Sequence, residues 1–189
     1  QRDKGGAPRV IISRASPVLM QRLFEVEVPE VYDEIVEIKS IAREPGQRAK
    51  VAVTSHDERV DPVGACVGMK GVRIHAIVRE LNNENIDVVE WSPDSIQFIK
   101  RALSPASPVN VDLRDDLDPP RAKVVVRAEE VSQAIGRGGQ NIRLASQLTG
   151  YELDVYRELQ EDEEDIDIEE FSDVLTEEIL ERLHEIGCD

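Results

Sequence analysis

The sequence predicts an α+β chain with two tandem small domains, each built from a three-stranded sheet packed with helices. The pattern aliphatic-Gly-x-x-Gly-x-x-Ile occurs at residues 67–74 and again at 135–142. Each copy lies inside the same order of expected elements: helix, strand, strand, helix, GxxG, helix, strand. An internal repeat of this kind indicates a duplicated structural unit. A chain of 189 residues is long enough for one or two such domains.

The first unit is expected at residues 16–92 and begins with a helix that Ser16 caps and Pro17 opens. Two strands follow at 35–41 and 49–53, because apolar and polar residues alternate there. The apolar face expected for the first helix consists of Val18, Leu19, Leu23 and Phe24. The remaining elements are a turn at Glu44-Pro45-Gly46, a short helix opened by Asp61-Pro62, a helix at 72–81 and a strand at 86–91.

The second unit is expected at residues 93–158, directly after a junction of only Ser92-Pro93. A linker this short predicts a nearly fixed relation between the two units. Ser92-Pro93 is also expected to begin a helix with Ile96, Phe98, Ile99 and Leu103 directed inward. The elements after it are strands near 109–113 and 122–127, helices at 130–135 and 140–148, a C-cap at Gly150 and a strand at 151–156.

The two GxxG segments have the residue types needed to hold a nucleic-acid backbone. Glycine lacks the Cβ that would keep a sugar-phosphate chain away, and each loop leads into a helix N-terminus that favours phosphate. Lys70 and Arg137 lie inside the loops, while Arg73 and Arg143 are expected on the first turn of the following helix. Bases would lie between that helix and the adjacent strand, on aliphatic side chains such as Ile142. The candidate RNA-binding residues are Val67, Gly68, Met69, Lys70, Gly71, Arg73, Ile74, Ile135, Gly136, Arg137, Gly138, Gly139, Gln140, Asn141 and Arg143.

A GxxG loop between short helices is how KH domains clamp about four nucleotides of single-stranded nucleic acid. A helix before the strand pair, with none after the last strand, is typical of the type II arrangement. We therefore expect two tandem type II KH domains that bind single-stranded RNA. In the competing interpretation a GxxG only links two helices. The presence of two copies, each with a basic residue inside, argues against this interpretation.

The net charge of −16 is concentrated at one end of the chain. Residues 158–189 hold fifteen acidic residues and one basic residue, whereas residues 1–157 hold 24 acidic and 22 basic residues. The repeated region is therefore nearly neutral. We expect residues 159–189 to form an acidic tail, with a solvated linker up to about residue 170 and an amphipathic helix at 171–186.

Nothing in the sequence favours an enzyme, a metal site or a cofactor. Cys66 and Cys188 show no CxxC spacing, and no Walker A pattern is present. The acidic runs Asp115-Asp116 and 161–165 are interpreted as solvated surface rather than as magnesium sites. His56, His75 and His184 share no metal-ligand spacing with the cysteines. No apolar run approaches the ~20 residues of a membrane span and no signal peptide opens the chain, so a cytoplasmic protein is expected, with no membrane partner.

Four segments resemble the NusA family of bacterial transcription elongation and termination factors: residues 41–46, 61–68, 102–106 and 134–141. The resemblance covers about residues 8–158, the tandem KH module of that family. It implies that an expected strand at 8–14 is the end of a preceding OB-fold domain, so that residues 1–15 are its remnant and linker. It also implies that the helix at 171–186 starts the acidic helical repeats of some members.

The same resemblance implies binding to nascent RNA, including antitermination sites, beside RNA polymerase and other Nus-type antitermination factors. The family's N-terminal polymerase-binding domain has no counterpart in this sequence, so RNA binding is expected here rather than full pausing activity. Two other interpretations stay open. One is a different KH protein, such as a ribosomal or exonuclease-associated one, and the other is a protein-interaction module that works through its acidic tail.

Overall fold

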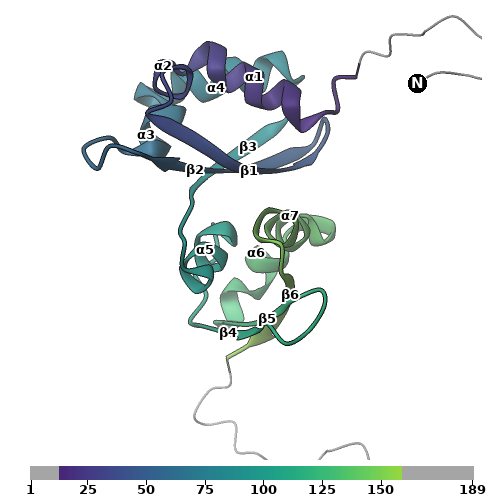
Figure 1. The fold of residues 1–189 in the computed structure, drawn as a ribbon. Coiled ribbons are helices and arrows are strands. Elements are labelled where there is room, and N and C mark those ends of the chain that lie inside the picture. Colours follow the sequence, from purple (N-terminus) through teal and green to yellow (C-terminus); the bar gives the residue numbers. More distant parts are fainter. Residues whose placement is uncertain (1–12, 159–189) are drawn as a thin grey trace, which may run out of the picture. The chain divides into compact units, whose positions relative to one another are not determined.

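The computed structural model describes residues 13–158, which fall within one compact unit holding two domains of the same design (Figure 1). The first domain consists of α1 (Pro17–Glu27), α2 (Pro29–Tyr32), β1 (Val36–Glu44), β2 (Arg48–Ser55), α3 (Pro62–Val67), η1 (Met69–Gly71), α4 (Val72–Glu80) and β3 (Asn85–Glu90). The second consists of α5 (Ser95–Ala102), β4 (Asn110–Arg114), β5 (Arg121–Val126), η2 (Ala128–Glu130), α6 (Val131–Ile135), η3 (Arg137–Gly139), α7 (Gln140–Thr149) and β6 (Glu152–Arg157).

Each domain has a three-stranded sheet in which the last strand lies at an edge. The strand orders are β1-β2-β3 and β4-β5-β6, and in both the first pair is antiparallel and the second parallel. A parallel pair needs a long crossover, and α3–α4 and α6–α7 provide it with a GxxG loop in the middle. The predicted α+β architecture of two tandem type II KH domains is confirmed.

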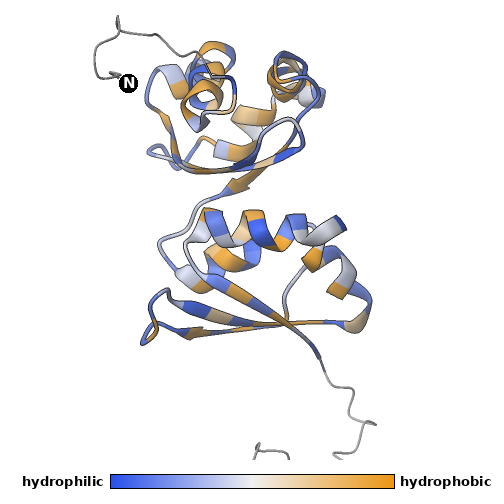
Figure 2. Ribbon diagram, turned by 90° about the vertical axis from the view of Figure 1, so that its right-hand side faces the viewer, coloured by the Kyte–Doolittle hydropathy of each residue, from blue (hydrophilic) through white to orange (hydrophobic). Residues whose placement is uncertain are grey.

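The helices cover one face of each sheet, as Figure 1 shows for α1, α2 and α4 above β1–β3. In Figure 2 apolar and polar residues alternate in short stretches along helices and strands, as expected for elements with one buried face. Because aromatic residues make up only 4% of the chain, the cores are mainly aliphatic. The largest fully buried apolar side chains include Phe24, Met20, Ile77, Ile99, Leu103 and Leu144.

Two details of the predicted helices are wrong. Helix α5 begins at Ser95 with Asp94 as its N-cap, whose side chain accepts a hydrogen bond from the Ile96 amide, so Ser92-Pro93 lies before the helix. Val18 was expected in the core but is 59% exposed. It precedes the buried Met20 by two residues, which is about 200° around a helix. Ile96, which was also expected to face inward, is 37% exposed.

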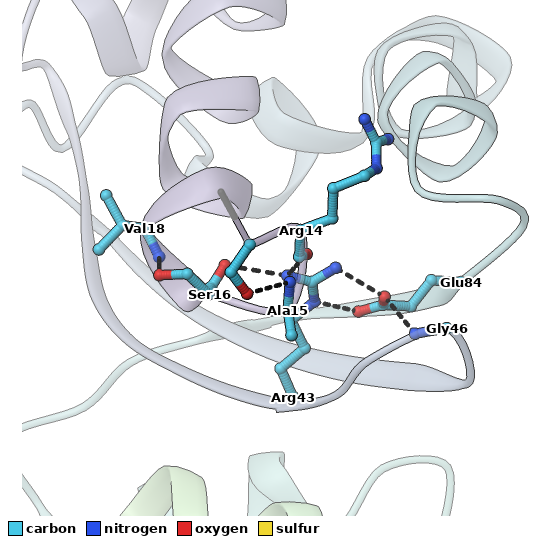
Figure 3. Close-up of polar contacts among 8 residues, drawn as sticks. Arg14, Ala15, Ser16, Val18, Arg43, Gly46 and Glu84 are labelled. Carbon is cyan, nitrogen blue, oxygen red and sulfur yellow. Dashed lines mark hydrogen bonds and ion pairs between the residues drawn. The ribbon is translucent and has the colours of Figure 1, made fainter. Parts of the chain in front are cut away.

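The chain enters the first domain over a buried ion pair (Figure 3). Arg43 donates from Nε and Nη2 to the two carboxylate oxygens of Glu84, at 2.6 and 2.9 Å, and the side chains are 3% and 0% exposed. Arg43 Nη1 also donates to the carbonyls of Arg14 and Ser16, while the Gly46 amide donates to Glu84. One buried pair therefore holds both the incoming segment and the β1–β2 turn.

The expected strand at 8–14 lies mostly outside the described residues, and Ser13 and Arg14 belong to no strand. The acidic linker and the helix expected at 171–186 also lie outside the described residues. Within residues 13–158, every helix is too short or too polar to cross a lipid bilayer.

The open face of the first sheet packs against helices of the second domain. Ala42 and Ala52 belong to the same buried cluster as Leu148 of α7. The Ser40 hydroxyl donates to the Leu148 carbonyl at 3.1 Å, and Lys50 Nζ donates to the Ser104 carbonyl at 2.9 Å. Small side chains on the sheet allow this close approach.

Candidate nucleic-acid interface

The two GxxG loops have the same backbone conformation. At equivalent positions the φ and ψ angles agree within a few degrees: Gly68 (74°, 168°) and Gly136 (75°, 171°), Lys70 (54°, 25°) and Gly138 (60°, 25°), Gly71 (76°, 15°) and Gly139 (73°, 13°). Three left-handed positions in each loop explain why glycine recurs there. The first loop places a lysine at one of them.

The first glycine of each loop is needed for close packing as well as for its backbone angles. A Cβ on Gly136 would lie 2.7 Å from the Cβ of Asn141, and one on Gly68 would lie 2.8 Å from the Cγ of Arg73. Around Gly138 and Gly139 there is open space on that side. Each loop is therefore held against its own helix at one end, while the second loop leaves its other end open to a ligand.

The basic residues inside the loops are exposed. Lys70 occupies the third position of the first GxxG and Arg137 the second position of the other. Within residues 13–158 neither side chain makes a hydrogen bond or an ion pair with the protein. Both cations are thus available to a phosphate group beside the loop glycines.

Arg73 is engaged by the protein itself. Its Nη1 donates to the Ala65 carbonyl at 2.6 Å and to Glu30 Oε2 at 2.8 Å. It thereby ties α4 to the end of α3 on the other side of the loop. Arg73 and Arg143 were both expected on the first turn of the helix after the loop, but they are not repeat equivalents, because the residue 68 positions after Arg73 is Asn141.

Asn141 has the same bracing role in the second domain. Its side chain is fully buried, and Nδ2 donates to the carbonyls of Leu103, Gln133 and Ala134 at 3.0, 3.3 and 3.1 Å. Gln133 is the repeat equivalent of Ala65, so both domains brace the loop at the same point. Asn141 Oδ1 is buried with no hydrogen-bond partner among the described residues.

Arg143 and Gln140 both contact the β1–β2 turn of the first domain. Arg143 Nε donates to Glu44 Oε1 at 2.6 Å, and its Nη2 approaches the Gly138 carbonyl at 3.4 Å. Gln140 Nε2 donates to Glu44 Oε2 at 2.8 Å and to Gln47 Oε1 at 3.2 Å. Hydrogen bonds from Gln140 and Arg143 lower the pKa of Glu44, so its carboxylate is charged at neutral pH.

A groove lies beside each loop, between the helix that follows it and the edge strand. The first has a volume of about 370 Å³ and the second about 300 Å³. The first is lined by Ile74, His75, Val78, Asn85, Ile86 and Asp87, together with Arg48 and Gln140. The second is lined by Ile142, Arg143, Ser146, Glu152, Leu153 and Asp154, which are the repeat equivalents of the first six.

The grooves combine an apolar wall with an open strand edge. Ile74 of the helix and Ile86 of the strand line the first groove, as Ile142 and Leu153 line the second. Strands β3 and β6 each pair on one side only within the described sheets, so their other edges present backbone N–H and C=O groups. A flat base could pack on the aliphatic side chains and form hydrogen bonds with the strand edge.

The structure brings together part of the predicted site and adds residues that the sequence did not reveal. Gly68 to Ile74 and Gly136 to Arg143 each form one loop and one helix start, as expected. Val67 instead packs against the first core, Met69 is 88% exposed, and Ile135 lines neither groove. The groove residues missed from sequence are Val78, Asn85, Ile86, Asp87, Ser146, Glu152, Leu153 and Asp154. The offset of 68 residues pairs Val78 with Ser146, whereas the strand residues pair at an offset of 67, which only the strand register reveals.

The structure also shows the surroundings of Cys66 and of Asp115, which were considered from the sequence as possible site residues. Cys66 is buried, and burial raises the pKa of its thiol to about 12. Asp115 accepts a hydrogen bond from the Tyr151 hydroxyl at 2.9 Å. Across residues 13–158, no group of three His, Cys, Asp or Glu side chains is placed to hold a metal ion.

Comparison with known proteins supports the resemblance seen in the sequence. The profile of the NusA-like first KH domain matches residues 14–91, and that of the NusA-like second KH domain matches residues 95–163. This chain belongs to the NusA family. The two KH domains described above are therefore the tandem KH domains of that family.

Its curated relatives are longer proteins. The transcription termination/antitermination protein NusA of Thermus thermophilus is 52% identical over 146 residues, which cover 77% of this chain and 37% of that protein. The protein of the same name from Bacillus subtilis is 46% identical over 169 residues, covering 83% of this chain and 45% of that protein. This chain thus spans less than half the length of either relative. The crystal structure of APE1850 has the same fold, with a TM-score of 0.55 and 23% identity over 75% of this chain and 96% of that one.

Proposed function

We propose that residues 13–158 bind single-stranded RNA along two equivalent sites, each made of a GxxG loop and the groove beside it. The observation that carries this proposal is the position-for-position match of the two grooves, each beside a loop with an exposed cation. Lys70 and Arg137 are exposed and have no protein partner among the described residues, so both can pair with a ligand beside the loops. A ligand with repeated negative charges and flat apolar groups fits this arrangement.

Each residue type has a distinct part in this proposal. The loop glycines let the sugar-phosphate backbone approach, and Lys70 and Arg137 pair with phosphates. Ile74 and Ile142 support the bases on the helix side of each groove. Arg73 and Asn141 act as braces that keep the loops in shape. Binding would occur with the RNA extended, because a base must leave its stack to enter a groove.

Charge reversal in the loops tests this proposal. Replacement of Met69-Lys70 or of Arg137-Gly138 by Asp-Asp places two carboxylates against the RNA backbone. Each change should weaken binding of a labelled RNA of about ten nucleotides by at least tenfold, and the two together should abolish it. Fluorescence anisotropy measures the affinity, and circular dichroism should be unchanged.

A matched control uses Arg22 and Val26 of α1, which line neither groove. Replacing both by Asp changes the net charge by the same amount as the Met69-Lys70 variant. Both side chains are exposed, so the fold should tolerate the change. The control should bind RNA like the parent. Equal affinities for the parent and the doubly reversed variant would rule out the loops as the binding site and favour the interaction-module interpretation.

For the wider role we propose that the chain acts on nascent RNA during bacterial transcription, in termination and antitermination, beside RNA polymerase and other Nus-type factors in the cytoplasm. The names of its relatives and its membership of the NusA family support this. A stalled bacterial elongation complex with photoreactive nucleotides in its transcript provides the test. The chain should crosslink to emerged RNA, and the variant with both loops reversed should not. Crosslinking of both proteins to the same extent would contradict the proposal.

A further inference from the structure

The groove of the first domain includes one lining residue from the second domain. Gln140, the first residue of α7, lines this groove together with Arg48, Asn85 and Asp87. The lining of the second groove comes from α7 and β6 of its own domain. The two grooves are therefore equivalent in six residues, and the first adds Arg48 from its own domain and Gln140 from the other.

The Gln140 side chain is held in one orientation. Its Nε2 donates to Glu44 Oε2 at 2.8 Å and to Gln47 Oε1 at 3.2 Å, which engages both of its N–H bonds. The turn that carries these acceptors is fixed by the Gly46 amide on Glu84 and by the Asn85 amide on the Gln47 carbonyl, at 2.8 and 3.1 Å. Gln140 Oε1 has no partner among the described residues, so the side chain can offer a ligand only an acceptor.

The neighbouring charges in this groove are already paired with each other. Arg48 Nε and Nη2 lie 2.9 and 2.6 Å from Asp87 Oδ2, and Lys50 Nζ lies 3.3 Å from the same atom. The Asp87 carboxylate is thus neutralised by two cations. Both cations contact Oδ2, which reduces the attraction of this carboxylate for the amino group of a base.

We propose that Gln140 of the second domain is a specificity-determining residue for the first groove, where it selects a base with an amino group at the purine C6 or pyrimidine C4 position, namely adenine or cytosine. Adenine and cytosine present an N–H₂ donor at the position where guanine and uracil present a carbonyl oxygen. A fixed acceptor forms a hydrogen bond with the first pair and faces an unpaired oxygen of the second pair. This inference rests on the proposed RNA binding and adds a composite site to it.

A single-position base scan tests the inference. Ten-nucleotide RNAs that differ only in the base at one position are titrated against the parent, for each position in turn. At one position A or C should bind about three- to tenfold more tightly than G or U, the range expected for one hydrogen bond. Gln140→Met keeps the side-chain length and removes the acceptor, so the preference at that position should fall below twofold while other positions keep theirs.

Two further variants make the test specific. Gln147→Met alters an exposed glutamine on the same helix, outside both grooves, and should leave every preference unchanged. Gln47→Met frees one N–H of Gln140, which becomes available to the carbonyl of a keto base, so G and U should gain at the same position. Thermal unfolding checks that each variant is folded.

The outcomes separate this inference from the proposed function. If the parent binds none of the RNAs, RNA binding itself is wrong. If the parent binds and loop charge reversal abolishes binding, but Gln140→Met retains the amino-base preference, only the role of Gln140 is wrong. Should Gln140→Met be unfolded, Gln47→Met decides, and an unchanged base preference there overturns the inference.

Discussion

The sheets of the two domains have equivalent strand pairing, but the other domain covers the open face of the first sheet and leaves that of the second exposed. Lys50 on β2 and Lys123 on β5 are equivalent, since each lies two residues after the arginine that begins its strand. Lys50 is fully buried, donates to the Ser104 carbonyl, and has its pKa lowered by burial. Lys123 is exposed and lies 4.9 Å from the centre of the Tyr156 ring. One position in a fold thus becomes core or surface according to whether another domain covers it.

A second difference lies near the end of the first strand of each sheet, β1 or β4, beside the residue that precedes the edge strand β3 or β6. The first domain has the buried ion pair Arg43–Glu84 there. The second has Leu113 and Tyr151, which pack against its apolar core. The register shows the equivalence, because Arg43 pairs with an alanine of β2 as Leu113 does with one of β5. The same space can be filled by a satisfied ion pair or by apolar side chains, and the two solutions should respond differently to mutation.

The largest effect is expected from breaking the buried pair. Glu84→Ala leaves the Arg43 guanidinium buried without its carboxylate and should lower the free energy of unfolding by about 3–5 kcal/mol. Urea denaturation measures this change. The double variant Arg43→Leu/Glu84→Tyr copies the second domain and should be more stable than Glu84→Ala. A double variant that is equally unstable would show that the apolar solution cannot be transferred.

Truncation of the two equivalent lysines should have unequal effects. Lys50→Ala removes a buried four-carbon chain and the hydrogen bond to Ser104, which should cost about 2–3 kcal/mol. Lys123→Ala removes an exposed side chain and should change stability by no more than about 0.5 kcal/mol. Urea midpoints of both variants provide the comparison, and similar losses would mean that the contact between domains adds little stability.

A smaller effect is expected from making the first loop like the second. Lys70 has the left-handed backbone that Gly138 provides without strain, so Lys70→Gly should raise the free energy of unfolding by about 1 kcal/mol. The same change removes a cation from the proposed phosphate site, and RNA affinity should fall with a salt slope smaller by about one. Thermal melts and anisotropy titrations at several salt concentrations check both parts. Unchanged RNA affinity would remove Lys70 from the binding site.

The smallest effect concerns pH and the buried thiol. Cys66 is equivalent to the buried Ala134, and its thiol pKa rises from 9.0 to about 12 because of burial. The unfolded chain therefore loses this proton at a lower pH than the folded chain, and stability should fall as pH rises above about 9. Compared with its value at pH 7, the stability of the parent relative to Cys66→Ala should be lower by about 0.8 kcal/mol at pH 9.5. A stability difference that is independent of pH would contradict the raised pKa.

The prediction from sequence was accurate where local patterns decide the structure. In the two domains of residues 16–158 the strands and helices appear in the predicted order, because period-two and helical spacing reflect which side of an element is buried. Boundaries were less accurate. Asp94, not Ser92, caps α5, since either residue can cap a helix and only the packing of Phe98 and Ile99 selects the register.

The residues of the candidate site also fall into those that local sequence predicts and those that depend on tertiary contacts. The loop glycines, Lys70 and Arg137 were predicted from residue type and spacing alone. Ile86 and Leu153 were missed because they belong to the grooves only through parallel pairing across a crossover. Arg73 was predicted to face RNA, whereas Glu30, 43 residues earlier in the chain, holds its side chain.

The sequence by itself determined the duplicated unit, through two copies of one pattern 68 residues apart. It also determined the element types and the two GxxG loops, because these depend on residues within one turn or one strand of each other. Tertiary structure alone decided which equivalent side chains are buried, which basic residues are already engaged, and that Gln140 lines the groove of the other domain. These properties depend on contacts between residues about 40 to 100 positions apart. Such contacts follow from how the sheet of one domain packs on the helices of the next, and no local periodicity encodes them.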